Sequence, residues 1–216
     1  MLKFQTNDTT TIATFEDFIL VVYVIIDNLY HRFASPEVAK RRHVLDTKLS
    51  DSEIITICIC DELAGVDSEN AWYSFVKRNY RHLFSKLCSR SRFNRTRRAL
   101  VQTTELLRQK IPSVYSLPGS QYYVADSFPP AVCKFGRARY CRSFRWYGAD
   151  YGRCPSKKET CFGYKVHALV TLEGYIAAFD ITAASTDDRE GLRGLVQGRT
   201  GIAVPADKGY AGEAFT

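Results

Sequence analysis

The sequence predicts an α+β protein, with a helical first part followed by a domain built on a mixed sheet. Apolar residues recur every three or four positions up to about residue 115, which is the spacing of amphipathic helices. After residue 121 they form short continuous runs instead, which favour buried strands. Pro112 and Pro118-Gly119 separate the two patterns, so we expect a helical region over 1–118 and a second domain over 119–216.

Helices in the first part are expected over about 15–33, 50–65, 68–78 and 91–107. Thr14 and Asp17 form a capping-box-like start for the first helix, and Ser50 and Glu53 form a capping box for the second. Pro112 is expected to close the last helix, because proline lacks the backbone N–H that a helix needs.

Strands in the second part are expected over 122–125, 163–172, 175–183 and 201–206, with a helix over about 187–195. The two prolines of 127–130 are expected to end the first strand. Glu173-Gly174 is expected to form the two-residue turn of a hairpin, and Ser185 or Thr186 to cap the helix.

Basic charge is concentrated in two blocks of a chain whose net charge is +7. The first 70 residues hold twelve acidic and six basic residues, whereas 77–110 hold eleven basic residues and one acid. A second block over 131–165 holds nine basic residues and two acids. Such blocks are typical of proteins that contact phosphates, so a nucleic acid is the expected partner.

The seven cysteines are expected to be reduced thiols, because their number is odd and a polar stretch, not a signal peptide, precedes them. The last four lie seven to thirteen residues apart, a poor fit to zinc sites, although a cysteine-rich zinc module stays a rival that a metal assay would reveal. The most apolar run, Ile19 to Ile26, is far shorter than a bilayer requires, so no membrane partner is expected.

Two aspartates are the candidate catalytic residues. Asp126 and Asp207 each follow directly after a short apolar run, where a carboxylate is held by rigid backbone at the rim of a sheet. If the two strands are neighbours, both carboxylates converge and can bind two divalent ions roughly 3.5–4 Å apart for phosphodiester chemistry. Either aspartate taken singly could instead be an ordinary turn residue.

Three motifs occur in order along the second part: Ala125-Asp126-Ser127, Phe162-Gly163-Tyr164-Lys165-Val166-His167 and Ala206-Asp207-Lys208-Gly209-Tyr210. Together they resemble the core of bacterial insertion-sequence transposases with a DDE catalytic triad. The stretches 126–145 and 156–160 resemble the insertion-sequence 982 family in particular.

This resemblance implies an RNase H-like core, in which three antiparallel strands precede a helix and a parallel strand. It also implies Mg²⁺ or Mn²⁺ at a two-metal centre, cleavage and transfer of DNA strands between the ends of an insertion sequence and target DNA, and a homodimer on those ends. The implied location is the bacterial cytoplasm, associated with the nucleoid.

Asp126 matches the first acid of that family and Asp207 the second, while the third, a glutamate on a later helix, has no counterpart. Glu213 is the one acid after Asp207, and it follows too closely to lie on a separate helix. We therefore expect an RNase H-like domain that is incomplete at its C-terminus, in a truncated chain that binds DNA but does not cut it.

Lys165 and His167 fall on one face of their strand, and the resemblance places such a pair close to the catalytic acids. Lys165 is a candidate phosphate contact, and His167 is either a residue that orients a ligand or the scissile strand, or a buried structural histidine. Asp187 and Asp188 are expected to favour a helix start rather than to bind metal. The expected DNA contacts are Arg92, Arg95, Arg97, Arg98, Lys134, Arg137, Arg142, Arg145, Lys157, Lys158, Lys165, His167 and Lys208.

The arginines of 90–98 have no acid to pair with in their own stretch of sequence, which favours a phosphate-binding face over solvated charge. Two rivals to a transposase remain: a non-catalytic DNA-binding fragment, and an RNase H-like nuclease acting on another nucleic acid.

Overall fold

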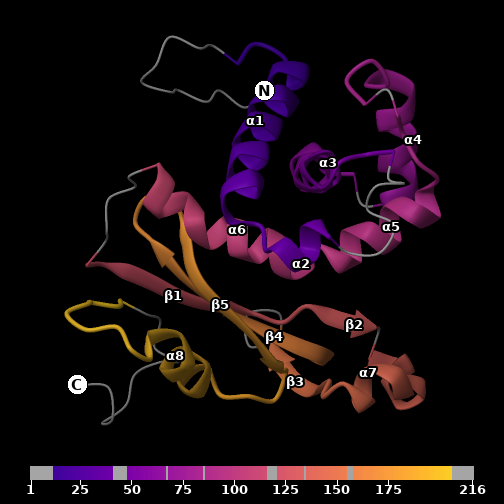
Figure 1. Ribbon diagram of the computed structural model, residues 1–216. Helices are drawn as coiled ribbons and strands as arrows, with labels where there is room; N and C mark the ends of the chain where they lie inside the picture. Colours follow the sequence, from indigo (N-terminus) through magenta and orange to yellow (C-terminus); the bar gives the residue numbers. More distant parts are fainter. Residues whose placement is uncertain are drawn as a thin grey trace. The chain divides into compact units, whose positions relative to one another are not determined.

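A computed structural model describes residues 12–40, 48–66, 68–84, 86–115, 121–133, 135–154 and 158–205. The chain divides into two compact units, Met1–Leu117 and Pro118–Thr216 (Figure 1). The predicted fold class is confirmed, because helices come first and an α+β unit with an RNase H-like sheet follows.

The first unit contains α1 (Phe15–Phe33), α2 (Pro36–Ala39), α3 (Asp51–Ala64), α4 (Glu69–Asn79), α5 (Arg90–Ala99) and α6 (Val101–Val114). Both predicted capping boxes are present, at Thr14 with Asp17 and at Ser50 with Glu53. Trp72 lies at the centre of the core, where its indole N–H donates to the carbonyl of Ile57. Among the described residues, no helix is both long and apolar enough to cross a membrane.

The prediction of one helix over 91–107 was wrong. The helix breaks at the buried Leu100, whose N–H still bonds back to the carbonyls of Thr96 and Arg97, and α6 begins at the next residue. Pro112 does not end α6, which continues to Val114. The proline lies in the last turn, where it removes one backbone hydrogen bond of the helix.

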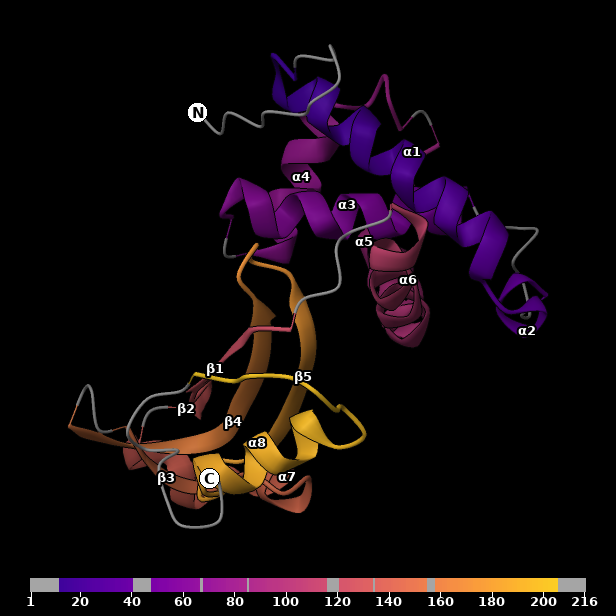
Figure 2. The same ribbon diagram turned by 90° about the vertical axis from the view of Figure 1, so that its left-hand side faces the viewer.

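The second unit contains β1 (Tyr123–Phe128), β2 (Ala131–Cys133), β3 (Asp150–Cys154), β4 (Glu159–Thr171) and β5 (Ile176–Ala183), with the 3-10 helix η1 (Phe135–Tyr140), α7 (Arg142–Trp146) and α8 (Asp188–Val196). The long β4 pairs antiparallel with all four other strands (Figure 2). β1 and β5 flank its second half, and β2 and β3 pair with its first half. Tyr122 and Ala203 form a parallel bridge beside β1.

Three local predictions in this unit need correction. β1 runs through Asp126 to Phe128, because the prolines that stop it begin at residue 129. The β4–β5 hairpin closes on Thr171 and Tyr175, so its loop has three residues, and Gly174 takes the left-handed conformation that such a loop requires. Asp187, rather than Ser185 or Thr186, caps α8 by accepting from the N–H of Arg189.

Helix α8 covers one face of the sheet. Leu192 and Leu195 of α8 pack on Leu169 of β4 and on Tyr123 and Ala125 of β1. A smaller cluster at the other end of β4 contains Phe162, Ala138 and Ala149. The two clusters fix which side chains of β1 and β4 face inward, and hence where the candidate site residues point.

Candidate catalytic site and nucleic-acid interface

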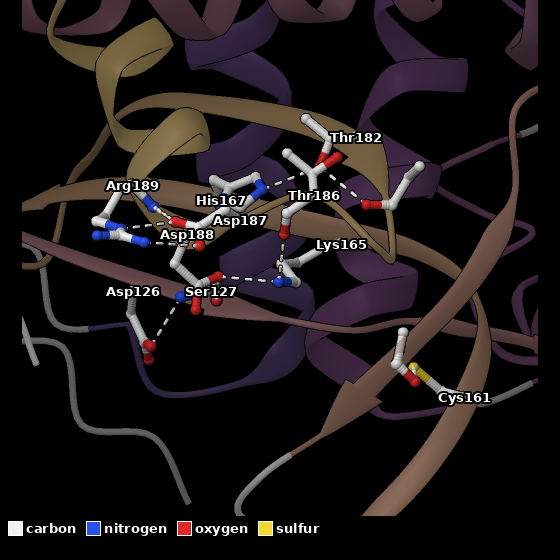
Figure 3. A network of polar contacts seen from close by, with 12 residues as sticks. Asp126, Ser127, Cys161, Lys165, His167, Thr182, Thr186, Asp187, Asp188 and Arg189 are labelled. Carbon is white, nitrogen blue, oxygen red and sulfur yellow. Dashed lines mark hydrogen bonds and ion pairs between the residues drawn. The ribbon is translucent and has the colours of Figure 1, made fainter. Parts of the chain in front are cut away.

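Asp126 lies on the face of β1 that points away from α8. Buried Tyr123 and Ala125 alternate with exposed Val124 and Asp126 along the strand. The carboxylate accepts the backbone N–H of Ser127 at 2.7 Å, and Figure 3 shows it directed away from the side chains that gather at the start of α8. Asp126 is therefore an exposed carboxylate fixed to a rigid strand rather than a turn residue after it.

Asp207 lies outside the described residues, but the segment that leads to it pairs with β1. The N–H of Tyr123 donates to the carbonyl of Ala203 at 2.9 Å, and the N–H of Ala203 donates to that of Gln121 at 2.7 Å. These bonds make Tyr122 and Ala203 partners in a parallel bridge. Four positions separate Tyr122 from Asp126, and four separate Ala203 from Asp207.

On the opposite face of β1, a polar network joins Ser127, Lys165 and Asp188 (Figure 3). The Ser127 hydroxyl donates to Asp188 Oδ1 at 2.8 Å, and Lys165 Nζ lies 3.1 Å from the same oxygen. Lys165 also donates to the carbonyl of Thr186 at 2.6 Å, and its side chain is 13% exposed. The network therefore fixes the start of α8 against the residue that follows Asp126.

Sequence reasoning missed this network. Lys165 was expected at a phosphate and Asp188 at a helix start, and nothing linked the two. The available signal was the period of two, which puts Lys165 on the same face of β4 as the core residue Leu169. A lysine on a face that a helix covers needs an acidic partner, because burying an unpaired charge is costly.

Asp187 and Asp188 both lie at the start of α8 but make different contacts. The Asp187 carboxylate accepts from the side chain and the N–H of Arg189, and these hydrogen bonds lower its pKa to about 2. Both partners are about half exposed. Asp187 is thus an exposed N-cap of α8, whereas Asp188 contacts Ser127 of β1 and Lys165 of β4.

His167 is buried on the α8 face of β4, 1% exposed. Its Nε2 lies 2.9 Å from the Thr182 hydroxyl, which itself donates to the carbonyl of Ala183. The tautomer of the ring decides which of these two atoms donates. Its Nδ1 is buried without a hydrogen-bond partner in the described part of the chain, and burial lowers the pKa of the ring.

The arginines of α5 divide between two environments. Glu69 of α4 accepts a hydrogen bond from Asn94 and lies 3.4 Å from Arg90 and 3.5 Å from Arg97. The expectation that this stretch has no acidic partner was therefore wrong for Arg90 and Arg97, because an acid from another helix reaches both. Arg95 and Arg98 are exposed and Arg92 is half-buried, and these three form no ion pair with any residue that the structure describes.

The other basic residues expected at DNA lie in the second unit. Arg137, Arg142 and Arg145 are exposed on η1 and α7, and Lys158 is exposed before β4. Lys134, Lys157 and Lys208 lie outside the described residues. Within the described ranges, no three or more His, Cys, Asp and Glu side chains converge where they could hold a metal ion.

The arrangement of three antiparallel strands, a covering helix and a parallel bridge defines an RNase H-like domain. Residues 119–216, almost the whole of this second unit, match the family described as transposase DDE domain. Neither the curated proteins nor the solved structures gave a match. The chain is thus similar to DDE transposases over its second unit.

Proposed function

We propose that the chain acts in DNA transposition, in the manner of the insertion-sequence 982 family, as a metal-dependent enzyme that cuts and joins DNA strands. Asp126 and Asp207 are two of its metal-binding acids, the ends of an insertion sequence are its substrate, and it works as a dimer on those ends. The match of residues 119–216 to a transposase DDE domain supports the class of reaction.

The bridge between Tyr122 and Ala203 carries the assignment of the two acids. A parallel pairing that keeps its register advances by one residue on each strand per step. If the pairing continues in register beyond the described residues, four further steps lead to Asp126 on one chain segment and to Asp207 on the other. Two carboxylates at matching positions of adjacent parallel strands are close enough to share metal ions.

Asp126, which lies within the described residues, has the chemistry to bind a hard cation such as Mg²⁺. Asp126 is exposed, and one of its oxygens accepts the N–H of its own neighbour, so the carboxylate keeps lone pairs for a metal. In the described part of the chain no lysine or arginine pairs with it. A pair of such ions, when bound, stabilises the attacking and leaving oxygens of an in-line displacement at phosphorus.

The chain's own residues keep the acid in place. Ser127, hydrogen-bonded to Asp188, and Lys165, paired with the same carboxylate, join β1 and β4 to the start of α8. A displacement of about 1 Å at a reacting centre can cost ~10²-fold in rate, so this bracing contributes to function. The basic residues of η1, α7 and α5 supply the attraction for the DNA backbone.

Mn²⁺ binding, followed by electron paramagnetic resonance, tests the two acids. We expect Asp126→Asn and Asp207→Asn each to weaken binding by tenfold or more, on the order of one charged ligand lost. Asp150→Asn is the matched control, because Asp150 is also exposed and accepts its own neighbour's N–H at 2.7 Å. Equal Mn²⁺ binding by all four proteins would contradict the proposal.

We expect the chain to bind DNA bearing insertion-sequence ends, and its Mg²⁺-dependent cleavage of that DNA to depend on both Asp126 and Asp207. Loss of one stabilising group at a developing charge typically costs about 10²–10³-fold in rate. Cleavage that Asp207→Ala leaves unchanged would contradict this role, and Glu213 would be the next acid to replace.

A further inference from the structure

The segment 135–147 exposes an unusual number of large aromatic side chains. Trp146 is 87% exposed, and the segment also exposes Phe135, Tyr140, Phe144 and Tyr147. Single exposed apolar residues are ordinary, whereas a cluster marks a surface that contacts another molecule. The five rings fall within thirteen positions of one unit, on η1, α7 and the residue after α7.

Arginines alternate with these rings. Arg137, Arg139, Arg142 and Arg145 are all exposed, and the sequence has no acidic residue from 131 to 149. Among the described residues none of the four arginines forms an ion pair, and the guanidinium of Arg139 lies 4.7 Å from the centre of the Tyr140 ring. The surface is therefore both aromatic and strongly positive.

The backbone beneath this surface is anchored to the sheet. Ala138 and Ala149 are buried against Phe162 of β4. The hydroxyl of Tyr164, also on β4, lies 3.4 Å from the carbonyl of Phe144 and 3.2 Å from that of Tyr147. Figure 1 shows α7 at the end of the sheet where β2 and β3 lie. Anchoring of this kind lets rings stay exposed in fixed positions, which lowers the entropy lost on binding.

We propose that this aromatic platform, made of Tyr140, Phe144, Trp146 and Tyr147 with the four arginines, binds unpaired bases of DNA by stacking. The proposal rests on the proposed function, since it names a feature of the same substrate. Aromatic rings stack on bases without regard to sequence, and arginines hold the phosphates between them. The faces of paired bases are hidden within a duplex, so the platform selects single strands, frayed ends or bases turned out of the helix.

The sheet register sets the distance between platform and catalytic acid. Asp126 lies opposite Ala168 of β4, and Cys133, just before η1, lies opposite Phe162. Six residues of strand span ~20 Å. The start of η1 therefore lies ~20 Å along β4 from the position of Asp126.

Intrinsic fluorescence of the full chain tests the platform directly. The chain has two tryptophans, of which Trp72 is 1% exposed, so quenching by a ligand at the surface reports on Trp146. The probe is a single-stranded oligothymidine, and a fully paired duplex of equal length is the comparison. We expect the single strand, and a duplex carrying unpaired bases, to quench Trp146 much more than the paired duplex does.

Binding of a labelled oligothymidine, followed by anisotropy, separates stacking from charge. Trp146→Ala should weaken binding roughly 5- to 150-fold, the range for one lost stacking contact, and Trp146→Phe should keep most of the affinity. Replacing Arg142 and Arg145 by Ala should lower the log–log salt slope by about 0.7 for each contact. Tyr115→Ala is the control, since Tyr115 is an exposed aromatic of the first unit.

Equal quenching by paired and unpaired DNA, or unchanged affinity of the Trp146→Ala chain, would overturn the proposal. So would quenching by polyglutamate and none by the oligonucleotide, which would indicate an acidic protein partner. The assay needs neither metal nor cleavage, so its result does not depend on the proposed catalytic centre. If Asp126→Asn and Asp207→Asn leave Mn²⁺ binding unchanged while the single strand still quenches Trp146, the proposed catalytic centre is wrong and the proposed platform stands.

Discussion

Gly191 of α8 lies directly on the imidazole ring of His167. A Cβ at residue 191 would overlap the ring atoms Nδ1, Cε1 and Cγ, so only glycine lets the helix approach the sheet this closely. The contact seals the buried histidine between β4 and α8, next to Lys165 and Asp188.

Gly191→Ala should destabilise the second unit by about 1–3 kcal/mol, the usual cost of forcing extra volume into a packed site. The ring cannot move away, because it is buried and bonded to Thr182. Gly194→Ala is the matched control on the same helix: its Cβ would come no closer than 3.9 Å to Asp180, and alanine favours the helix. Urea unfolding measures both variants, and equal stabilities would contradict the packing argument.

Stability should fall as the pH drops below 6.5. Burial lowers the pKa of His167 from that ordinary value, Asp188 and Asp180 oppose the shift, and Lys165 adds to it. The unfolded chain therefore takes up the proton at a higher pH than the folded chain. The stability that neutral His167 gives the folded state is complete above pH 6.5, and it is lost as the pH falls toward the lower pKa of the folded state. The measurement is the unfolding midpoint at pH ~7.5 and at pH ~5.5. The midpoint should change less between these two pH values in His167→Gln than in the unaltered chain. If the midpoint changes equally in the unaltered chain and in His167→Gln, His167 does not cause the pH dependence.

Asp188→Asn should destabilise the second unit by about 1–3 kcal/mol, because it leaves the largely buried ammonium of Lys165 without its charged partner. Asp187→Asn should leave the unfolding midpoint nearly unchanged. Its partner Arg189 is half exposed, water screens that pair, and asparagine caps a helix as well as aspartate does. A larger loss in Asp187→Asn than in Asp188→Asn would reverse this ranking.

Local rules predicted the elements whose stability is local. The capping boxes at Thr14 and Ser50 follow from hydrogen bonds within four residues, and both are present. Alternation and apolar runs predicted β4, β5 and α8 to within a few residues. The same rules missed the break at Leu100, a residue that is buried in the core.

The candidate site was predictable in its residues and not in its contacts. Spacing picked out Asp126, and the period of two put Lys165 and His167 on one face. The pairing of Lys165 with Asp188, and of Arg97 with Glu69, joins residues more than twenty positions apart. Such pairs depend on tertiary packing, which periodicity does not encode.

The arginines of α5 give the last prediction, which concerns duplex DNA and the first unit. As phosphate contacts, Arg92, Arg95, Arg97 and Arg98 each contribute about 0.9 to the log–log dependence of affinity on salt, so replacing all four by alanine should flatten the slope by up to ~3.6. Arg97→Ala alone should change the slope by less than the ~0.9 of a full phosphate contact, because Arg97 already lies 3.5 Å from Glu69. Replacing all four by lysine keeps the charge and should keep the slope. Anisotropy titrations between about 50 and 200 mM salt measure these slopes. If the slope stays the same when the four arginines become alanine, the helix displays solvated charge and DNA is bound elsewhere.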